Sequence, residues 1–134
     1  ERGLIPGNQT YDIIVGNPYQ TPVSTTQVEG HRRRDYWGRT LIDASITLIP
    51  PLLKKSGVAW LTHLSIVSLA QTKQVLEAHK LTIEIEDDSG LLEFGENFNQ
   101  NMVHIERIEN ESDAYHKNIG GKNYAVVNIL RITH

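Results

Sequence analysis

The sequence predicts an α/β fold whose sheet has parallel strands at its centre. Residues 13–15 form an apolar run without alternation, and residues 58–66 form a mostly apolar run with weak alternation. Such runs are typical of strands that are buried on both faces. A segment of helical period, residues 36–53, lies between them. The run 81–86 alternates apolar and acidic residues, which predicts a strand with one wet face at the edge of the sheet. The final run, 124–132, is the most β-prone of the chain.

The first helix is indicated by apolar residues that recur three and four positions apart over residues 36–53. Asp35 is its expected N-cap. The two prolines at 50–51 disturb the last turn, so the regular part of the helix is expected to end or bend near Ile49. Residues 54–57, which read KKSG, are expected to close the helix with basic residues and a glycine.

The second half of the chain is expected to hold one more helix and a strand-rich tail. Ser68 and Gln71 match a capping box, which predicts a helix over residues 69–79. Four segments are expected between the strand at 81–86 and the final strand. They are a turn at 87–90, short strands at 91–94 and 102–108, and a polar loop at 109–122.

Composition limits the protein class. At 134 residues the chain is expected to form one domain, and 39% hydrophobic with 22% charged residues is an ordinary globular mixture. A net charge of −3 gives no global electrostatic signal for nucleic acid. There are no cysteines, no run long enough for a membrane helix and no visible signal peptide, so a soluble cytoplasmic protein without membrane partners is expected.

The stretch with the clearest chemistry is YDIIVGNPYQ, residues 11–20. Pro18 cannot donate to a β-ladder, so the strand must stop there. The turn then delivers the amide of Asn17 and the ring of Tyr19 to the carboxyl edge of the sheet. Open α/β sheets bind their ligands at that edge.

These residues carry a family resemblance. The run VGNPYQ resembles motif IV of class I S-adenosylmethionine-dependent methyltransferases that act on planar amino nitrogens, where it usually contains NPPY, as in the VGNPPYQ of adenine-specific DNA methyltransferases. Here the motif has one proline fewer. The resemblance implies a Rossmann-like methyltransferase sheet with an antiparallel pair at its edge, and S-adenosylmethionine as cofactor.

The resemblance also implies roles for single residues. Asn17, Pro18 and Tyr19 become the catalytic residues. In the family the Asn side chain and the backbone carbonyl after it accept hydrogen bonds from the target amino group, and the aromatic ring stacks on the planar substrate. Gly16 and Asn17 become cofactor-binding residues.

The glycine-rich cofactor loop of such enzymes is absent from the sequence. No GxGxG pattern occurs, and paired glycines are found only at Gly120 and Gly121. Residues 1–134 therefore resemble the C-terminal, substrate-side half of a methyltransferase domain. The expected protein partner is the missing N-terminal half or another subunit.

A basic run ends the polar loop that follows the motif. His31, Arg32, Arg33 and Arg34 are predicted to bind substrate, because arginines beside a ligand edge can contact phosphates. The alternative is a solvated surface loop. The six histidines of the chain show no HExxH or His-x-His spacing, so no metal site is expected.

Two isolated residues are given structural roles. His63, within the second strand, is expected to be a hydrogen-bonded core residue. Trp37 is expected to anchor the first helix.

Three functions follow from these observations. The first is methylation of the exocyclic amine of adenine in DNA or RNA, with nucleic acid as the partner. The second is methylation of a protein glutamine amide. The third is a non-catalytic, partner-binding fragment that lacks the cofactor half.

Overall fold

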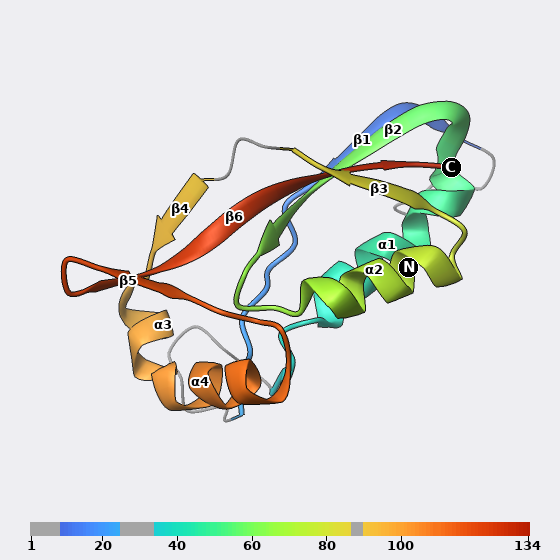
Figure 1. The fold of residues 1–134 in the computed structure, drawn as a ribbon. Helices are drawn as coiled ribbons and strands as arrows, with labels where there is room; N and C mark the ends of the chain where they lie inside the picture. Colours follow the sequence, from blue (N-terminus) through green and yellow to red (C-terminus); the bar gives the residue numbers. More distant parts are fainter. Residues whose placement is uncertain (1–8, 25–33, 87–89) are drawn as a thin grey trace.

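The computed structural model describes residues 9–24, 34–86 and 90–134. Within these ranges, six strands form one mixed sheet, and two helices, α1 and α2, lie side by side on one of its faces (Figure 1). The strands are β1 Tyr11–Gly16, β2 Leu53–Leu64, β3 Thr82–Ile85, β4 Gly90–Glu93, β5 Lys117–Ile119 and β6 Lys122–Thr133. The helices are α1 Thr40–Leu52, α2 Leu69–Ala78, α3 Glu96–Gln100 and α4 Met102–Glu111.

The sheet combines one parallel pair with antiparallel strands, in the order β1-β2-β6-β3. β1 runs parallel to β2, and the predicted parallel pair is confirmed. The last strand, β6, lies antiparallel between β2 and β3, so the predicted antiparallel edge is present too. The first half of β6 pairs with β4 and β5 instead, which makes β6 the strand that joins the two ends of the molecule (Figure 1).

The main core lies between the sheet and the two helices α1 and α2. Ile42, Ile46 and Ile49 recur on one face of α1 and are almost completely buried. They pack in one cluster with Leu61 of β2 and Leu130 of β6. Burying one such side chain contributes about 1.5–3 kcal/mol, so this layer holds the helices in place.

The start of α1 differs from the expectation in a way that its hydrogen bonds explain. The helix begins at Thr40 rather than at residue 36, and its N-cap residue, Arg39, makes no capping bond with its side chain. The Asp35 carboxylate nevertheless accepts hydrogen bonds from the backbone N–H groups of Arg39 and Thr40, at 3.1 and 3.2 Å. Asp35 thus satisfies the first helical donors from outside the helix.

The helix range predicted at 36–53 ends almost where α1 ends. α1 includes both prolines and continues to Leu52, so it does not stop near Ile49, and the backbone N–H of Leu53 bonds back to the Ile49 carbonyl. The predicted closing residues are wrong. Residues 54–57 do not close the helix, because they already belong to β2. The ladder pairs Tyr11 with Leu53 and then Ile13 with Val58, so residues 54–57 form an irregularity in the strand.

The predicted strand at 102–108 is also wrong, because these residues belong to α4. Ile105 and Ile108 are both fully buried. Residues three apart lie on the same face of a helix but on opposite faces of a strand, so only the helix buries both. The predicted loop at 109–122 is wrong in part, because it contains the end of α4, all of β5 and the start of β6.

Other predicted elements are confirmed. Ser68 caps α2 by accepting a hydrogen bond of 3.0 Å from the backbone N–H of Gln71. The strands predicted at 81–86, 91–94 and 124–132 correspond to β3, β4 and β6. Most of the predicted turn at 87–90 lies outside the described residues.

The prediction that β1 is buried on both faces is wrong. Ile14 packs against the main core, but its neighbours Ile13 and Val15 are 66% and 76% exposed. Successive side chains of a strand point to opposite faces, and α1 and α2 cover only one face. In the described part of the chain β1 also pairs with β2 alone, which leaves its outer edge open.

Gly57 is expected to tolerate no side chain. A Cβ atom at this position would lie 2.9 Å from the Asp12 carbonyl oxygen and 2.7 Å from Leu53 Cδ1. We predict that Gly57→Ala lowers the free energy of unfolding by about 1–3 kcal/mol, because the backbone must move to relieve the overlap. Urea unfolding measures the change.

The matched control is Gly90→Ala in β4, where a Cβ would meet only Val127 Cβ at an ordinary 3.9 Å. Equal stabilities of the two variants would contradict the packing at Gly57.

Candidate functional site

The residues of the predicted motif follow β1 directly, at the carboxyl end of the parallel pair. Gly16 ends β1 and lies opposite Leu61 of β2. The next residue, Asn17, accepts through Oδ1 a hydrogen bond of 2.5 Å from the hydroxyl of Thr62. An amide oxygen has two lone pairs, so this bond leaves one acceptor position of Asn17 for a ligand.

Gln20 attaches this loop to β2. The residue is only 2% exposed, and its Nε2 donates to the carbonyl oxygens of Pro18 and Thr62, at 3.1 and 2.8 Å. Its Oε1 accepts from the backbone N–H of Leu64 at 2.9 Å. The Pro18 carbonyl is therefore held in place while one of its lone pairs stays available.

Tyr19 lies at a cavity of about 580 Å³. Its side chain is half exposed, and the other walls come from the end of β4 and from α3. Phe98 of α3 lines the cavity and is held by an edge-to-face contact with Phe94, with ring centroids 5.0 Å apart. An aromatic ring on each of two separate segments makes this cavity suitable for a flat ligand.

The predicted substrate-binding run lies mostly outside the described residues. This is the case for His31, Arg32 and Arg33. Arg34 is described, and it is exposed beside Asp35.

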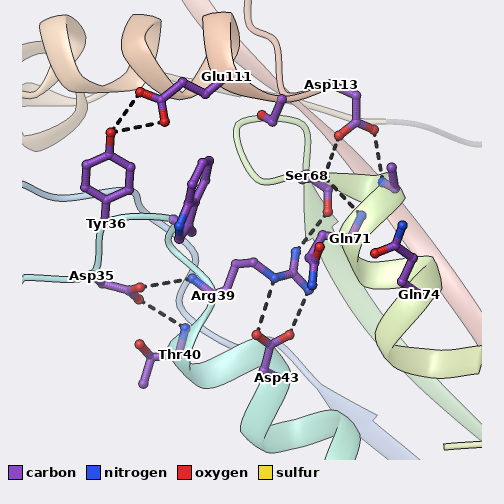
Figure 2. A pocket seen from close by; sticks show the side chains of 13 residues that line it. Asp35, Tyr36, Arg39, Thr40, Asp43, Ser68, Gln71, Gln74, Glu111 and Asp113 are labelled. Atoms are coloured by element: carbon purple, nitrogen blue, oxygen red, sulfur yellow. Dashed lines mark hydrogen bonds and ion pairs between the residues drawn. The ribbon is translucent and has the colours of Figure 1, made fainter. Parts of the chain in front are cut away.

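A second cavity, of about 700 Å³, lies where the N-terminal ends of α1 and α2 approach the C-terminal end of α4 (Figure 2). It shares no lining residue with the Tyr19 cavity. Trp37 lines it, is 41% exposed and precedes the first residue of α1, so it lies outside the helix that it is expected to anchor. Among the lining residues are also Tyr36, Arg39 and four carboxylates, from Asp35, Asp43, Glu111 and Asp113.

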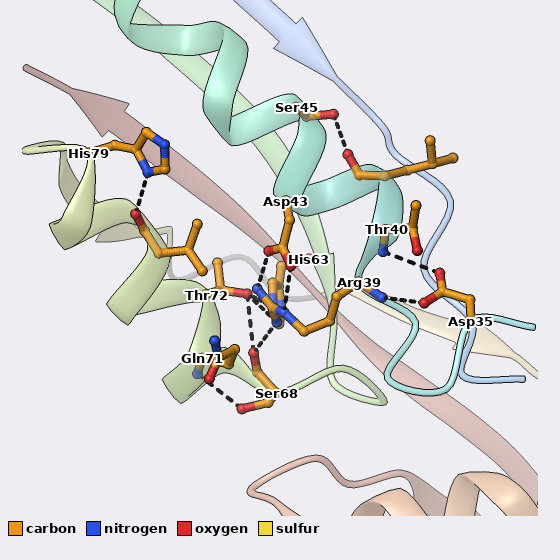
Figure 3. A network of polar contacts seen from close by, with 12 residues as sticks. Asp35, Arg39, Thr40, Asp43, Ser45, His63, Ser68, Gln71, Thr72 and His79 are labelled. Atoms are coloured by element: carbon orange, nitrogen blue, oxygen red, sulfur yellow. Dashed lines mark hydrogen bonds and ion pairs between the residues drawn. The ribbon is translucent and has the colours of Figure 1, made fainter.

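Arg39 forms the floor of the second cavity and is 7% exposed. Its guanidinium pairs with both carboxylate oxygens of Asp43, at 2.7 and 3.3 Å. It also donates to the Ser68 carbonyl and the Thr72 hydroxyl, at 2.9 and 3.0 Å (Figure 3). These bonds join the starts of α1 and α2, and they satisfy a charge that would be costly to bury alone.

His63 lies beneath this network and is fully buried, as predicted for a core histidine. Its Nε2 lies 2.9 Å from the Thr72 hydroxyl (Figure 3). Burial, together with the nearby Arg39 charge, lowers the pKa of His63 to about 4. His63 is therefore neutral at pH 7, and its Nδ1 has no hydrogen-bond partner among the described residues.

Asp113 stabilises the start of α2. Its carboxylate accepts hydrogen bonds from the Ser68 hydroxyl and the Ala70 backbone N–H, at 2.5 and 3.0 Å. Burial alone would raise the pKa of Asp113, but these hydrogen bonds outweigh it and hold the pKa below its ordinary value. Asp113 is thus ionised at neutral pH.

Two functional candidates were missed by reasoning from the sequence. Gln20 stands inside the quoted motif, yet its role depends on backbone groups of β2 more than 40 residues away. Thr62 contacts Asn17 across a similar separation. The local sequence signal for Gln20 was its position directly after Asn17, Pro18 and Tyr19.

Comparison with known proteins gives no match: no protein-family model fits this chain, and no curated protein is significantly similar to it. Within the described residues, no helix combines the length and apolar character needed to cross a membrane. No group of three or more acidic or histidine side chains in the same ranges could hold a metal ion.

We predict that His63 makes the stability depend on pH. Its pKa is about 4 in the folded state, against 6.5 ordinarily. Between these values the unfolded chain binds a proton that the folded chain does not. The free energy of unfolding should therefore fall by about 3 kcal/mol as the pH decreases from 6.5 to 4. Urea unfolding at several pH values measures it.

His63→Gln should remove this part of the pH dependence. His79→Gln, at the C-cap of α2, is the control and should leave it in place, because His63 is still present. An unchanged profile in the His63 variant would show that another group is responsible.

Proposed function

We propose that this chain is the substrate-side part of an S-adenosylmethionine-dependent methyltransferase, and that its target is the exocyclic amine of adenine in DNA or RNA. The observation that supports this most is the end of β1. There the amide oxygen of Asn17, the carbonyl of Pro18 and the ring of Tyr19 follow one another in the chain, and Tyr19 lines a cavity. These are two acceptors and a flat surface, which are the groups that a planar amine requires.

The chemistry follows from the acceptors. The lone pair of an adenine amine is delocalised into the ring, so the nitrogen is a poor nucleophile. Its two N–H groups would donate hydrogen bonds to the Asn17 amide oxygen and the Pro18 carbonyl. These bonds would localise the lone pair on the nitrogen and stabilise the positive charge that develops there during methyl transfer. Both acceptors are already fixed, by Thr62 and by Gln20. Fixed dipoles need little rearrangement during the reaction.

The fold is compatible with the proposal. The parallel β1–β2 pair followed by antiparallel strands is the arrangement that the motif resemblance implies. An adenine in duplex DNA would first have to be flipped out, because the motif cannot reach a stacked base. The basic run at 31–34 is the proposed contact to phosphates.

The cofactor would supply the methyl group. Gly16 and Asn17 would contact the cofactor only on the side that faces the substrate amine. Residues 1–134 contain no glycine-rich loop. We propose that another segment or subunit carries that loop and docks along β1. The open edge of β1 and the exposed side chains of Ile13 and Val15 support this location.

Tyr19 variants test the proposed stacking. Tyr19→Phe should keep the affinity for adenosine, because a ring still stacks, while Tyr19→Ala should weaken it by about 1–3 kcal/mol. Chemical-shift titrations of the labelled chain with adenosine measure both affinities. Tyr115→Ala, which removes another half-exposed tyrosine outside the Tyr19 cavity, is the control.

Equal effects of the two Tyr19 changes would contradict stacking on this ring. If the chain binds N-acetylglutamine amide but not adenosine, the protein-amide alternative replaces the adenine proposal. If it binds neither, the methyl-acceptor site itself is refuted.

A further inference from the structure

The second cavity has the size and composition of a ligand site that the proposed methyl transfer does not use. Its volume of about 700 Å³ falls within the range of small-molecule pockets. Its walls come from the starts of α1 and α2, the end of α4 and the segment before α1 (Figure 2). Three parts of the chain that are distant in sequence, residues 35–43, 68–74 and 111–113, therefore form one concave surface.

The lining carries an excess of negative charge, with four carboxylates against the single guanidinium of Arg39. Asp35, Asp43 and Asp113 use both of their oxygens to accept hydrogen bonds from the protein. Arg39 is itself directed at Asp43, Ser68 and Thr72. A cation that enters the cavity therefore meets an attractive potential that Arg39 compensates only in part.

Glu111 differs from the other three carboxylates. Its oxygens accept only from the hydroxyl of Tyr36, at 2.9 and 3.1 Å, and it forms no ion pair in the described part of the chain. A carboxylate offers about four acceptor positions, so Glu111 can bind further donors. Figure 2 shows Glu111 and Tyr36 together on one side of the cavity.

An aromatic pair gives a second and independent indication of the ligand. The rings of Tyr36 and Trp37 meet edge to face with centroids 5.0 Å apart, and both are about two-fifths exposed. His104 supports them, because its ring lies edge-on to Tyr36 and its Nε2 lies 2.8 Å from the Tyr36 carbonyl. Exposed aromatic faces beside carboxylates attract organic cations through the ring quadrupole.

A metal ion does not suit this arrangement. Hard cations need several carboxylate oxygens that converge within about 2.6 Å of one point. Here the carboxylates are distributed around a wide cavity, and no group of three in the described residues could hold a metal. A larger cation that is flat or extended fits the spacing better.

We propose that this cavity binds an organic cation, namely a guanidinium or ammonium group, with the aromatic faces of Trp37 and Tyr36 on one side and the Glu111 carboxylate as its ion-pair partner. The group would be presented either by a basic side chain of a peptide or by a free polyamine. The inference rests on the cavity alone and does not require the methyltransferase proposal.

The test is a chemical-shift titration of the ¹⁵N-labelled chain with a capped Gly-Arg-Gly peptide. The matched ligand is capped Gly-citrulline-Gly, which has the same shape without the charge, and spermidine is the free amine. We expect the arginine peptide to shift the indole N–H of Trp37 and the side-chain amides of Gln71 and Gln74, which line the cavity. The citrulline peptide should shift none of them.

Two variants locate the binding. Trp37→Leu and Glu111→Gln should each weaken binding about two- to five-fold. The matched controls are Tyr115→Leu and Glu106→Gln, which remove an exposed ring and an exposed charge outside the cavity and should change nothing. The dispersion of the amide spectrum shows directly whether each variant is folded.

Each outcome decides the proposal. Binding of the arginine peptide identifies a polypeptide as the source of the cation, and binding of spermidine alone identifies a free amine. The proposal is overturned if neither ligand produces shifts at about 10 mM, a concentration well above the millimolar dissociation constants expected of weak sites. Equal binding of the citrulline peptide overturns it as well, as do unchanged affinities in both cavity variants.

Discussion

The candidate site depends on the hydrogen bonds of one buried side chain, Gln20. The β1–β2 ladder ends at the Gly16–Leu61 pair, because Pro18 has no N–H to continue it. The amide of Gln20 takes over by bonding to the carbonyl of Thr62 and the N–H of Leu64, the next backbone groups along β2. The side-chain amide of Gln20 thus makes the hydrogen bonds to β2 that the main chain of the loop does not make. The main chain can therefore leave the sheet at Asn17.

This arrangement explains how a loop can hold a defined geometry. Loops are usually the mobile part of a fold, but this one has its carbonyl at Pro18 and its amide at Asn17 each fixed by a partner. Because Gln20 is buried, removing it would leave backbone groups of β2 without partners, which is more costly than losing an exposed bond. The same interaction therefore stabilises the fold and positions the two proposed acceptors.

The sequence predicted those helices and strands that are determined by residues close to one another in the chain. The Ser68 cap, the alternating strand β3 and the β-prone strand β6 were all recognised, because caps and periodicity act within a few residues. The start of β2 was not, because its first residues lie at an irregularity of the ladder with β1, where Leu53 is paired and the next pair is at Val58. The exposure of Ile13 and Val15 could not be foreseen either, since it depends on which face the helices cover.

In the candidate sites, too, features set by neighbouring residues could be predicted and features set by tertiary contacts could not. Asn17, Pro18 and Tyr19 are neighbours in sequence, so the motif could be recognised, but the cavity beside Tyr19 is completed by β4 and α3. The second cavity had no sequence signal at all. Its aromatic pair stood in a segment that was assigned to a helix, and Glu111 stood in a predicted loop. Only tertiary structure brings these residues together.

We propose that the end of β1 recognises a planar amino group through the two acceptors that Gln20 and Thr62 hold. The most direct measurement compares the affinity of the chain for adenosine and for purine riboside, which lacks the exocyclic amine but keeps the rings. We expect adenosine to bind about two- to ten-fold more tightly, and Asn17→Ala to remove most of this preference. Equal affinities for the two nucleosides, or a preference that survives Asn17→Ala, would contradict it.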